Sequence, residues 1–443
     1  MSRSEPATSG GDPQKTDVGS VFVSNYPPYS FWSMDQVPRA LQTLAAPPRP
    51  ATPLGLYLHI PFCRKRCKFC YFKVYTEKQG HEVKRYLDAL AREVELHSRQ
   101  PAIAGRPLKF VYVGGGTPSF ISAAQLRELI ARLTQAIPWD DVEEVTFECE
   151  PGTLTRRKVA AIRQIGVTRL SLGVESFDDR ILEENGRAHV SKEIYRVAPW
   201  IREEGFDQLN IDLIAGMVGE TEATWQDSVR RTLELDPDSV TIYQMELPFN
   251  TVYSRRLLGG DQALAVADWA TKRSWQDHAI EELSRGGFEI SSAYTMVKRG
   301  APVRFVYRDS VWHGCDLLGA GVASFSHVSG VHFQNEAGWE PYLTRVESGE
   351  PPLARAFETS AAERLTRETI LQLKLGRLDA GYFRDKFGVD LAERFGPALA
   401  RLQSQGLLQL DNGTVRLTRQ GLLRVDTLLP EFYDPRYQGS RYT

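Results

Sequence analysis

Three cysteines crowd into eight residues of this 443-residue chain, in the arrangement Cys63-x-x-x-Cys67-x-x-Cys70. Three thiolates on one short loop can bind three irons of a 4Fe–4S cluster, because soft sulfur ligands suit iron–sulfur chemistry. The fourth iron would then lack a protein ligand and stay open to a bound molecule, as catalytic metals commonly do. The alternatives are chance clustering and a zinc site, which needs a fourth ligand when it is closed.

The composition indicates the kind of protein, and the cellular compartment, to which these cysteines belong. Hydrophobic residues make up 42% of the chain, and 54 Lys and Arg balance 56 Asp and Glu, for a formal net charge of -2. This balance argues against a dominant surface for nucleic acid or other polyanions. No apolar run approaches the roughly 18–20 residues that span a bilayer, and the polar N-terminus lacks the apolar core of a signal peptide. We therefore expect a soluble, cytoplasmic protein without a membrane span, in which clustered cysteines indicate metal binding before disulfides.

Short β-branched or aromatic runs alternate with amphipathic stretches through the middle of the chain. The runs that we predict as strands are 56–60, 110–113, 144–147, 169–172, 208–213 and 239–243. The stretches 83–97, 125–137 and 222–233 between them have the apolar period of helices. Repetition of strand and helix predicts right-handed βαβ units and a parallel sheet. Six units suit a curved or barrel-like sheet better than a flat one.

Unusual residues follow each predicted strand at its C-terminal end. They are Cys63, the run 114–118 (Gly-Gly-Gly-Thr-Pro), Glu148, the run 173–176, Asp212 and the run 244–248. Ligands of parallel α/β proteins bind at the C-terminal ends of the strands. Six such strand ends on one rim therefore predict one large site.

The rest of the chain divides by composition. Residues 1–20 are polar and aperiodic and are expected to form a disordered tail. An aromatic segment opens an N-terminal arm over 21–50, and the core domain with its C-terminal extension is expected over 51–354. Over 355–443, amphipathic stretches precede a hairpin around Asp411-Asn-Gly413, which predicts a helical, winged-helix-like domain. No basic stripe marks a recognition helix there, so nucleic acid is not an expected partner.

The cysteine spacing after a first strand, with Phe69 before the last cysteine, resembles the radical S-adenosylmethionine (SAM) enzymes. The likeness is closer to the oxygen-independent coproporphyrinogen III oxidases and their heme-chaperone relatives. The motifs that carry it are Leu56-Tyr-Leu-His-Ile-Pro-Phe-Cys63, Gly114-Gly-Gly-Thr-Pro118, Glu148-x-x-Pro151, Arg169-Leu-Ser-Leu-Gly-Val174, Asn210-Ile-Asp-Leu-Ile214 and Leu318-Gly-x-Gly-Val322. This resemblance implies an α/β fold with a partial (βα)6 TIM-like barrel, a 4Fe–4S cluster, and one or two molecules of SAM.

The resemblance also assigns roles to individual positions. Cys63, Cys67 and Cys70 would bind the cluster, and the first SAM would contact Tyr57, Gly115, Glu148 and Phe325. A second SAM would contact Phe69, Gly116, Thr117, Glu175, Arg187, Asp212 and Met245. Glu175 stands where the family has Gln, and a carboxylate only accepts hydrogen bonds whereas an amide also donates them. No residue is assigned as catalytic.

Two further departures bear on the reaction. The oxidases carry an additional Cys where this chain has Phe72, and the heme chaperones carry a His where it has Tyr307. The segment Asn25-Tyr-Pro-Pro28 resembles the N-terminal arm of the oxidases, which is shortened or absent in the chaperones. Each subfamily is therefore matched in part.

The leading prediction is an enzyme of porphyrin and heme biosynthesis. It would cleave SAM reductively to a 5′-deoxyadenosyl radical and decarboxylate the propionates of coproporphyrinogen III oxidatively. Its expected partners are a small-molecule substrate of the tetrapyrrole class and an electron donor such as flavodoxin or ferredoxin. The alternatives are a class C radical SAM methyltransferase, a heme-binding and trafficking protein, and a regulatory iron–sulfur module.

Overall fold

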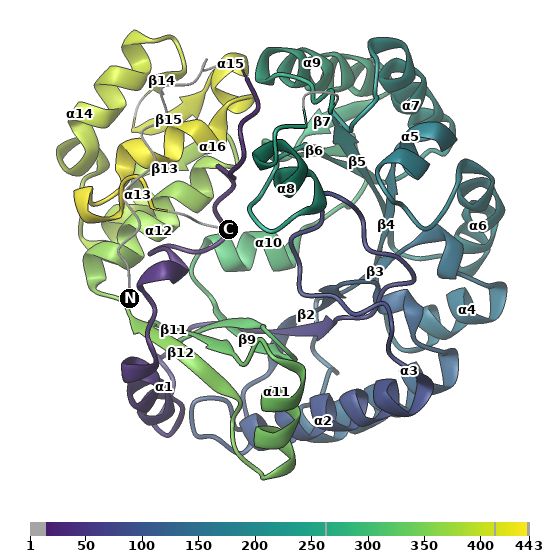
Figure 1. The fold of residues 1–443 in the computed structure, drawn as a ribbon. Coiled ribbons are helices and arrows are strands. Elements are labelled where there is room, and N and C mark those ends of the chain that lie inside the picture. Colours follow the sequence, from purple (N-terminus) through teal and green to yellow (C-terminus); the bar gives the residue numbers. More distant parts are fainter. Residues whose placement is uncertain (1–14, 262–263, 412, 441–443) are drawn as a thin grey trace.

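The computed structural model describes residues 15–261, 264–411 and 413–440 (Figure 1). All six predicted strands are present, and they pair in parallel, each with the next one along the chain. They are β1 (Leu54–Ile60), β2 (Leu108–Gly115), β3 (Glu144–Cys149), β4 (Arg169–Glu175), β5 (Gln208–Ala215) and β6 (Ser239–Gln244). In β1, Leu56, Leu58 and Ile60 are 0% exposed and pack against the helices, which leaves Tyr57 and His59 on the opposite, inner face.

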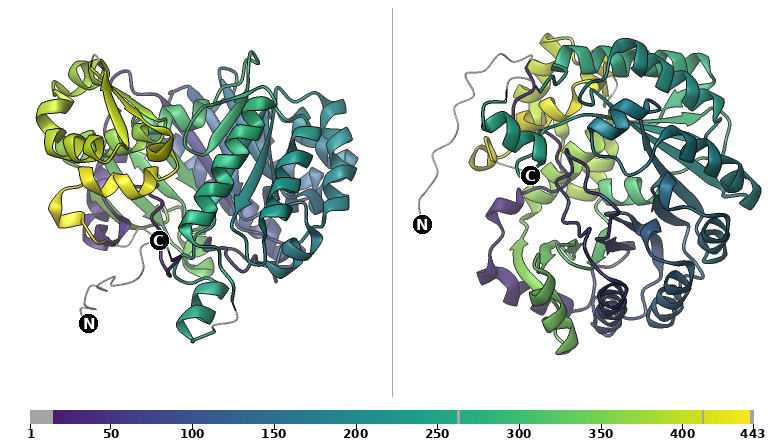
Figure 2. Two further views of the ribbon diagram at one scale, coloured as in Figure 1. Left: turned by 90° about the horizontal axis from the view of Figure 1, so that it is seen from above. Right: turned by 45° about the vertical axis from the view of Figure 1, so that its right-hand side comes forward.

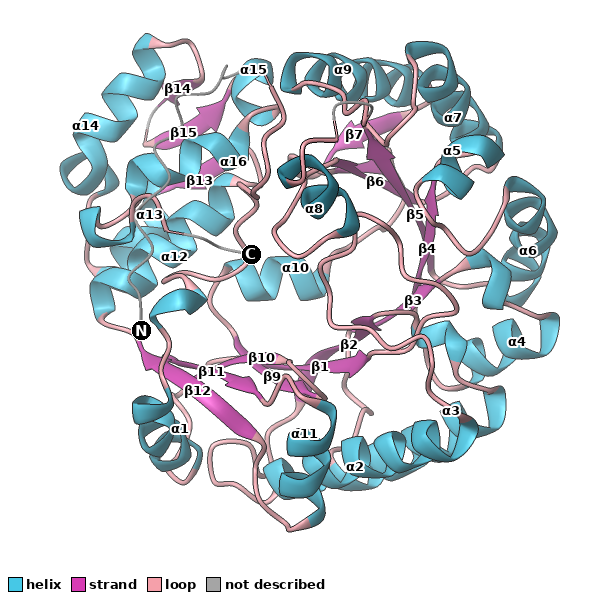
Figure 3. Cartoon of the chain, viewed as in Figure 1, coloured by secondary structure: helices cyan, strands magenta, loops and turns pink. Residues whose placement is uncertain are grey.

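Helices cover the outside of this sheet, as Figure 3 shows. They are α2 (Gly80–Ser98), α3 (Ala123–Ala136), α4 (Arg156–Gln164), α5 (Asp179–Glu184), α6 (Ser191–Glu204), α7 (Glu222–Glu234) and α9 (Trp269–Arg285). The short helix α8 (Val252–Leu258) lies instead at the rim, inside the ring of helices. Local sequence determines where α3 begins. The Ser122 hydroxyl accepts a hydrogen bond from the Gln125 backbone N–H at 3.2 Å, and the Gln125 side chain accepts one from the Ser122 N–H at 3.0 Å. This reciprocal pair is a capping box, which satisfies two amide groups at the helix start.

Additional strands extend the sheet at both edges to twelve, in the order β12-β11-β10-β9-β1-β2-β3-β4-β5-β6-β8-β7. The added elements are β7 (Phe288–Ile290), β8 (Thr295–Lys298), β9 (Asp316–Ala320), β10 (Phe325–Val328), β11 (Val331–Asn335) and β12 (Leu353–Glu358), with α10 (Val306–Trp312) and α11 (Trp339–Glu347). Within the described residues no pairing joins β12 to β7, so the curved sheet is an open, partial barrel. Helix α10 packs on its inner face, where Tyr307 contacts Phe110 and Tyr112.

The N-terminal arm lies along the barrel and includes α1 (Val37–Leu44), which packs on β12 (Figure 1). Of the predicted disordered tail, residues 1–14 lie outside the described residues. Residues 15–20, by contrast, contact the barrel: the Gly19 N–H donates to the Leu247 carbonyl at 2.8 Å, and the Thr16 hydroxyl donates to the Ala267 carbonyl at 2.7 Å. Their polar composition did not indicate these contacts, which use mainly backbone carbonyls of the core.

The C-terminal part forms its own helical unit with a small sheet, beside the barrel in Figure 2. Its elements are α12 (Ala361–Leu373), β13 (Arg377–Asp379), α13 (Ala380–Phe387), α14 (Leu391–Ser404), β14 (Leu408–Asp411), β15 (Thr414–Leu417), α15 (Arg419–Leu422) and α16 (Val425–Leu428). The predicted hairpin is the antiparallel pair β14–β15; residue 412 in its turn lies outside the described residues. The predicted boundary at residue 355 falls inside β12, which pairs with β11 of the main sheet. No helix of the described residues is long and apolar enough to cross a membrane.

Candidate active site

The three clustered cysteines lie on the loop between β1 and α2, at the C-terminal rim of the barrel. All three are free thiols, with Cys63 buried and Cys67 and Cys70 partly exposed. Burial, with a smaller contribution from the neighbouring Cys67 sulfur, raises the pKa of Cys63 to about 11 and that of Cys70 to about 12. The three thiols share one loop of eight residues. Negative charge on them requires a cationic partner, which an iron–sulfur cluster supplies.

The glycine run after β2 lies against this loop without side chains in between. A Cβ atom added to Gly116 would lie 2.9 Å from the Phe62 carbonyl oxygen and 3.0 Å from the Cys63 sulfur. Gly115 has a φ of 116°, which favours glycine. The Thr117 hydroxyl donates to the Cys63 sulfur at 3.4 Å. The run therefore brings backbone close to the cysteines, as a cradle for a ligand requires.

Glu148, at the end of β3, faces the same space. It accepts hydrogen bonds from the Tyr112 hydroxyl at 2.6 Å and from the Gly115 N–H at 3.1 Å. Burial raises the pKa of its carboxyl group, and the nearby Glu175 raises it further. A buried carboxylate of this kind is stabilised by a cationic ligand.

Tyr57 lies beside Glu148's partner Tyr112, with their rings stacked at 6.0 Å between centroids. The Tyr57 hydroxyl lies 3.0 Å from His59 Nδ1. Burial lowers the pKa of His59 to about 4, so the imidazole is neutral and Nδ1 can accept from the hydroxyl. Phe325, on β10, packs with its ring centroid 5.5 Å from that of Trp32 in the arm.

Arg187 links the loop after β4 to the cysteines. Its guanidinium donates to the Gly173 carbonyl at 2.7 Å and to the Cys67 sulfur at 3.5 Å, and it lies 3.5 Å from the Glu175 carboxylate. Glu175 itself has a φ of 64°, unusual for a residue with a side chain. The acid that replaces the family's Gln therefore forms an ion pair with the arginine expected beside it.

Asp212 stands on the neighbouring strand β5. It accepts hydrogen bonds from the Ser171 hydroxyl at 2.8 Å and the Asn210 amide at 2.9 Å. Burial and the charge of Glu175 raise its pKa to about 8. Glu148, Glu175 and Asp212 thus form an acidic group on β3, β4 and β5.

The remaining two predicted residues, Met245 and Phe69, belong to or pack against a small apolar cluster at the rim. Met245 is 3% exposed and packs with Met217, Leu247 and Tyr253, and Phe69 packs against the same cluster. Gly115, Glu148 and Tyr57 meet on the inner wall, whereas Gly116, Thr117, Glu175, Arg187 and Asp212 follow the rim around the cysteine loop. The roles of all these residues in binding SAM stay predictions.

Several residues of the inner wall had no motif to mark them. Tyr243 follows the inner face of β6, and Tyr71 lies on the cysteine loop; they are 42% and 41% exposed, and burial of their hydroxyl groups raises the pKa of both. Tyr112, Ser171 and Asn210 hold the predicted acids in place. For Tyr112, Ser171, Asn210 and Tyr243, alternation along each strand was the available signal, since these residues lie on the inner face with the acids.

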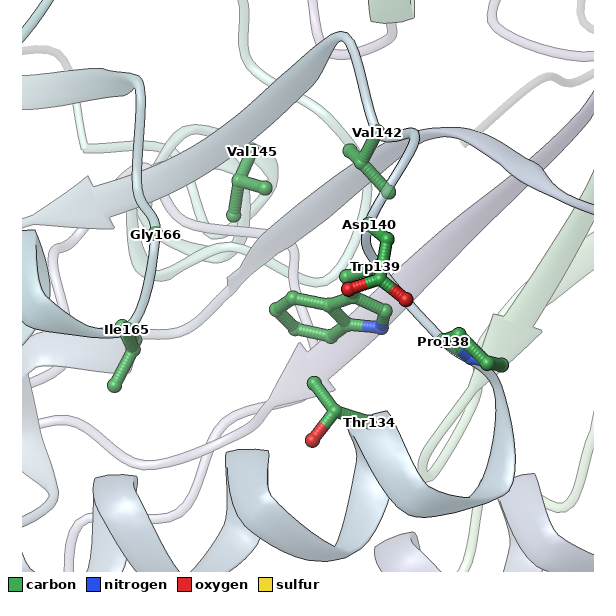
Figure 4. Close-up of a pocket in the computed structure, with 8 residues that line it drawn as sticks. All are labelled: Thr134, Pro138, Trp139, Asp140, Val142, Val145, Ile165 and Gly166. Atoms are coloured by element: carbon green, nitrogen blue, oxygen red, sulfur yellow. The ribbon is translucent and has the colours of Figure 1, made fainter.

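A pocket elsewhere does not belong to this site. It has a volume of about 240 Å³ and lies among Thr134, Trp139, Val145 and Ile165, near the N-terminal end of β3, opposite to the cysteine loop (Figure 4). In the described residues, no three His, Cys, Asp or Glu side chains converge to hold a single metal ion. A 4Fe–4S cluster does not need such convergence, since each thiolate binds a different iron.

Comparisons with known proteins agree with this geometry. Residues 57–232 match the radical SAM superfamily, and residues 359–424 match the HemN C-terminal domain. The oxygen-independent coproporphyrinogen III oxidase of Escherichia coli (strain K12) is 27% identical over 430 residues, 93% of this chain and 92% of that protein. The heme chaperone HemW of Mycobacterium tuberculosis is 31% identical over 396 residues, 89% of this chain and 98% of that protein.

A solved structure, coproporphyrinogen III oxidase (HemN) from Escherichia coli, described as a radical SAM enzyme, superposes with a TM-score of 0.80 at 25% identity. It covers 95% of this chain and 99% of that one. The partial barrel, the cysteine loop at its rim and the C-terminal domain are thus the architecture of this group. The chain belongs to the radical SAM superfamily and, within it, to the family of oxygen-independent coproporphyrinogen III oxidases and HemW heme chaperones.

Proposed function

We propose that this chain is a radical SAM enzyme in which Cys63, Cys67 and Cys70 hold a 4Fe–4S cluster. The superfamily uses this cluster together with SAM. When bound, the two supply reductive cleavage of SAM to a 5′-deoxyadenosyl radical, which abstracts a hydrogen atom from a substrate. The observation that carries the proposal is a single loop with three free thiols, of which Cys63 lies against the glycine cradle at Gly116.

The chain's own residues fit these groups. Glu148 offers a buried carboxylate to the ammonium group of SAM, held in place by Tyr112 and Gly115. Arg187 offers positive charge beside Cys67 and has a buried Nε atom without a partner in the described residues. Thr117 orients the Cys63 sulfur. The barrel wall encloses the space next to them and keeps bulk water from a reactive intermediate.

For the substrate, we propose coproporphyrinogen III, whose propionates would lose a β-hydrogen atom, one further electron and carbon dioxide to become vinyl groups. The electron requires an acceptor. Support comes from the oxidase relatives, which match over nearly the whole chain, and from the arm, which places Tyr29 and Trp32 beside Phe325. An electron donor such as flavodoxin or ferredoxin and a cytoplasmic location are parts of the same proposal.

A second candidate is heme binding and trafficking without turnover of porphyrinogen. It is favoured by the HemW relative at 31% identity and by Phe72, which is 44% exposed and stacks on Tyr71, where the oxidases are expected to have a cysteine. Tyr307, where a chaperone histidine is expected, packs 4.4 Å from Tyr112 between ring centroids. The phenyl group of Phe72 and the phenol of Tyr307 are poorer metal ligands than the cysteine of the oxidases and the histidine of the chaperones. The chain therefore lacks one expected metal ligand of each subfamily.

Product analysis separates these candidates. Anaerobically reconstituted protein with dithionite and SAM should release 5′-deoxyadenosine, and with coproporphyrinogen III it should yield the monovinyl product with loss of carbon dioxide. Methylated substrate together with S-adenosylhomocysteine would instead indicate methyl transfer. Stoichiometric heme uptake without decarboxylation would support trafficking. Absence of 5′-deoxyadenosine from fully reconstituted protein would exclude the enzyme proposals.

The ligand assignment has its own matched pair of variants. Cys67→Ala should lose the visible absorbance of the cluster and most of its iron. Cys315→Ala should keep both, because Cys315 is 2% exposed and lies on the inner side of the barrel near Phe110 and Val306, away from the loop. Equal iron contents in the two variants would refute the assignment of Cys67.

A further inference from the structure

One row of side chains can be followed across the sheet from the cofactor side to the far edge. Tyr57 of β1 pairs with Tyr112 of β2 on one side and with Gly319 of β9 on the other. His327 pairs with Leu317, so Phe325 lies opposite Gly319 in the antiparallel pair β9–β10. Further out, Phe325 pairs with Gln334, and Gln334 pairs with Arg355 of β12.

Residues directly opposite one another across paired strands point to the same face of a sheet. Tyr57 and Tyr112 are on the inner face, as the hydrogen bond from Tyr112 to Glu148 shows. Phe325, Gln334 and Arg355 are therefore on the inner face too. Arg355 is a cation on the barrel's inner wall, on the side away from the acids of β3 to β5.

The guanidinium of Arg355 is held in a fixed position. Its Nε donates to the Gln334 side-chain oxygen at 2.6 Å, and one terminal nitrogen donates to the Tyr29 carbonyl at 3.2 Å. Its carbon lies 4.8 Å from the centroid of the Tyr29 ring. These contacts preorganise the group without neutralising it, since both acceptors are uncharged.

Arg355 has no carboxylate partner in the part of the chain that the structure describes. A guanidinium has five N–H donors, and the two hydrogen bonds above use two of them. The nearby Arg39 differs: it makes two hydrogen bonds to Glu358, at 2.9 and 2.7 Å, on the exposed side of the same strand. A rigid, half-buried guanidinium with free donors is a group suited to two-point binding of a carboxylate.

Acidic and basic groups thus stand on two sides of the inner wall, apart from the ion pair of Arg169 and Glu144. Glu148, Glu175 and Asp212 stand on β3 to β5, with Arg187 paired to Glu175. Arg355 stands on β12, across the row that passes Phe325. A cationic cofactor is favoured on the first side and an anionic group of a second ligand on the other.

We propose that Arg355 binds a carboxylate of the substrate and thereby orients it toward the cofactor side of the barrel. This inference rests on the proposed function, and it assigns a residue to the binding of one of the substrate's carboxylates. Arg355 is a binding residue that sets specificity. Phe325 and Tyr29, next to it, offer apolar aromatic faces to the body of the substrate.

The test uses full-length, anaerobically reconstituted protein with coproporphyrin III as a stable fluorescent probe. Arg355→Gln should weaken binding of this probe roughly 10- to 100-fold, because it removes a charged hydrogen-bonding group. Arg39→Gln, the matched control, should bind it as the wild type does. The affinity for SAM should stay the same in both variants. A large loss of SAM affinity in Arg355→Gln would overturn the proposal by making Arg355 a cofactor residue.

A measurement on the wild type alone guards against misfolding of the variant. The tetramethyl ester of coproporphyrin III should bind to the wild type more weakly than the acid does. Equal affinities of acid and ester for the wild type would overturn the proposal. Probe binding needs no turnover. If the protein forms no 5′-deoxyadenosine, the proposed function is refuted, but the binding measurement still tests whether Arg355 binds a carboxylate.

Discussion

The exchange of Glu148 for Gln separates a role in cofactor binding from a role in folding. In the free protein Glu148 only accepts hydrogen bonds, from the Tyr112 hydroxyl and the Gly115 N–H. A glutamine can keep both, with its oxygen accepting from Gly115 and its amide donating to a reoriented Tyr112 hydroxyl. Burial raises the pKa of Glu148, so losing its charge does not cost stability in the empty site. We expect little change in the free energy of unfolding.

The affinity for SAM should fall in the same variant. A hydrogen bond to a charged group contributes about 1.5–3 kcal/mol, and each 1.4 kcal/mol is tenfold in affinity. The expected loss is therefore about 10- to 150-fold in the dissociation constant of SAM. Isothermal titration of reconstituted protein under anaerobic conditions measures it, and thermal unfolding measures the stability.

Glu144, on the same strand and the same face, is the matched control. It accepts from Arg169 at 2.9 Å, and through its second oxygen it accepts from the Val306 N–H at 2.7 Å, at the start of α10. Glu144→Gln leaves the buried Arg169 without its counter-charge, which costs roughly 3–5 kcal/mol of stability when a buried pair is broken. The two variants should thus have different defects: Glu148→Gln loses affinity for SAM, and Glu144→Gln loses free energy of unfolding. Unchanged SAM affinity in Glu148→Gln would refute the role of this carboxylate.

Two further predictions concern the cradle and a buried acid behind the wall. Gly116→Ala adds a Cβ about 3.0 Å from the Cys63 sulfur and should lower the iron content after reconstitution. The control Gly396→Ala, with no atom within 4 Å of the added Cβ, should keep it. Equal iron contents in the two variants would contradict the role of Gly116 as a cradle. Burial raises the pKa of Glu93 from 4.5 to about 7, so its proton stabilises the fold fully below pH 4.5 and this stabilisation is lost as pH rises through 7. The wild type should therefore lose about 3 kcal/mol relative to Glu93→Gln between pH 4.5 and 8, and parallel pH profiles of unfolding would contradict this.

The sequence allowed the six parallel strands and their C-terminal ends to be predicted because each depends on local information. A run such as Phe110–Val113 is apolar and β-branched within a few residues, and the topology of parallel sheets brings all the strand ends to one rim. Cys63, Gly116 and Glu148 could be placed together for this reason. The added strands β9 to β12 are only four to six residues long and pair antiparallel at β10 to β12, so no periodicity announced them.

Residues whose role depends on register could not be found in this way. Tyr112 is 36 residues from Glu148 in the chain, and Arg355 faces the inner wall only because β12 pairs in a particular register with β11. A shift of one residue would turn Arg355 outward and Ala354 or Ala356 inward. The sequence around Arg355 shows an ordinary charged residue after a proline-rich turn. Its significance lies in contacts that join distant segments.

The arm makes this dependence on distant contacts explicit. Glu246, just beyond the end of β6, accepts hydrogen bonds from the Ser20 hydroxyl and from the backbone N–H groups of Val21 and Phe22. Lys374, at the end of α12, donates to the Val23 carbonyl at 2.7 Å. The arm is thus fixed at one end by the barrel rim and the C-terminal domain.

Tyr29 follows these anchors in the arm, seven residues after Phe22. It provides both the carbonyl and the ring that hold Arg355. The position of Arg355 therefore depends on the arm, and the arm depends on two elements far away in the chain. A protein that lacks the arm could keep the cysteine loop, the glycine cradle and the acids of β3 to β5, but its Arg355 would lose one of its two hydrogen bonds and its aromatic support. If the proposed roles hold, removal of the arm should impair substrate orientation more than cofactor binding, because the cysteine loop, the glycine cradle and the acids belong to the six βα units, whereas Arg355 belongs to the edge strand and is held by the arm.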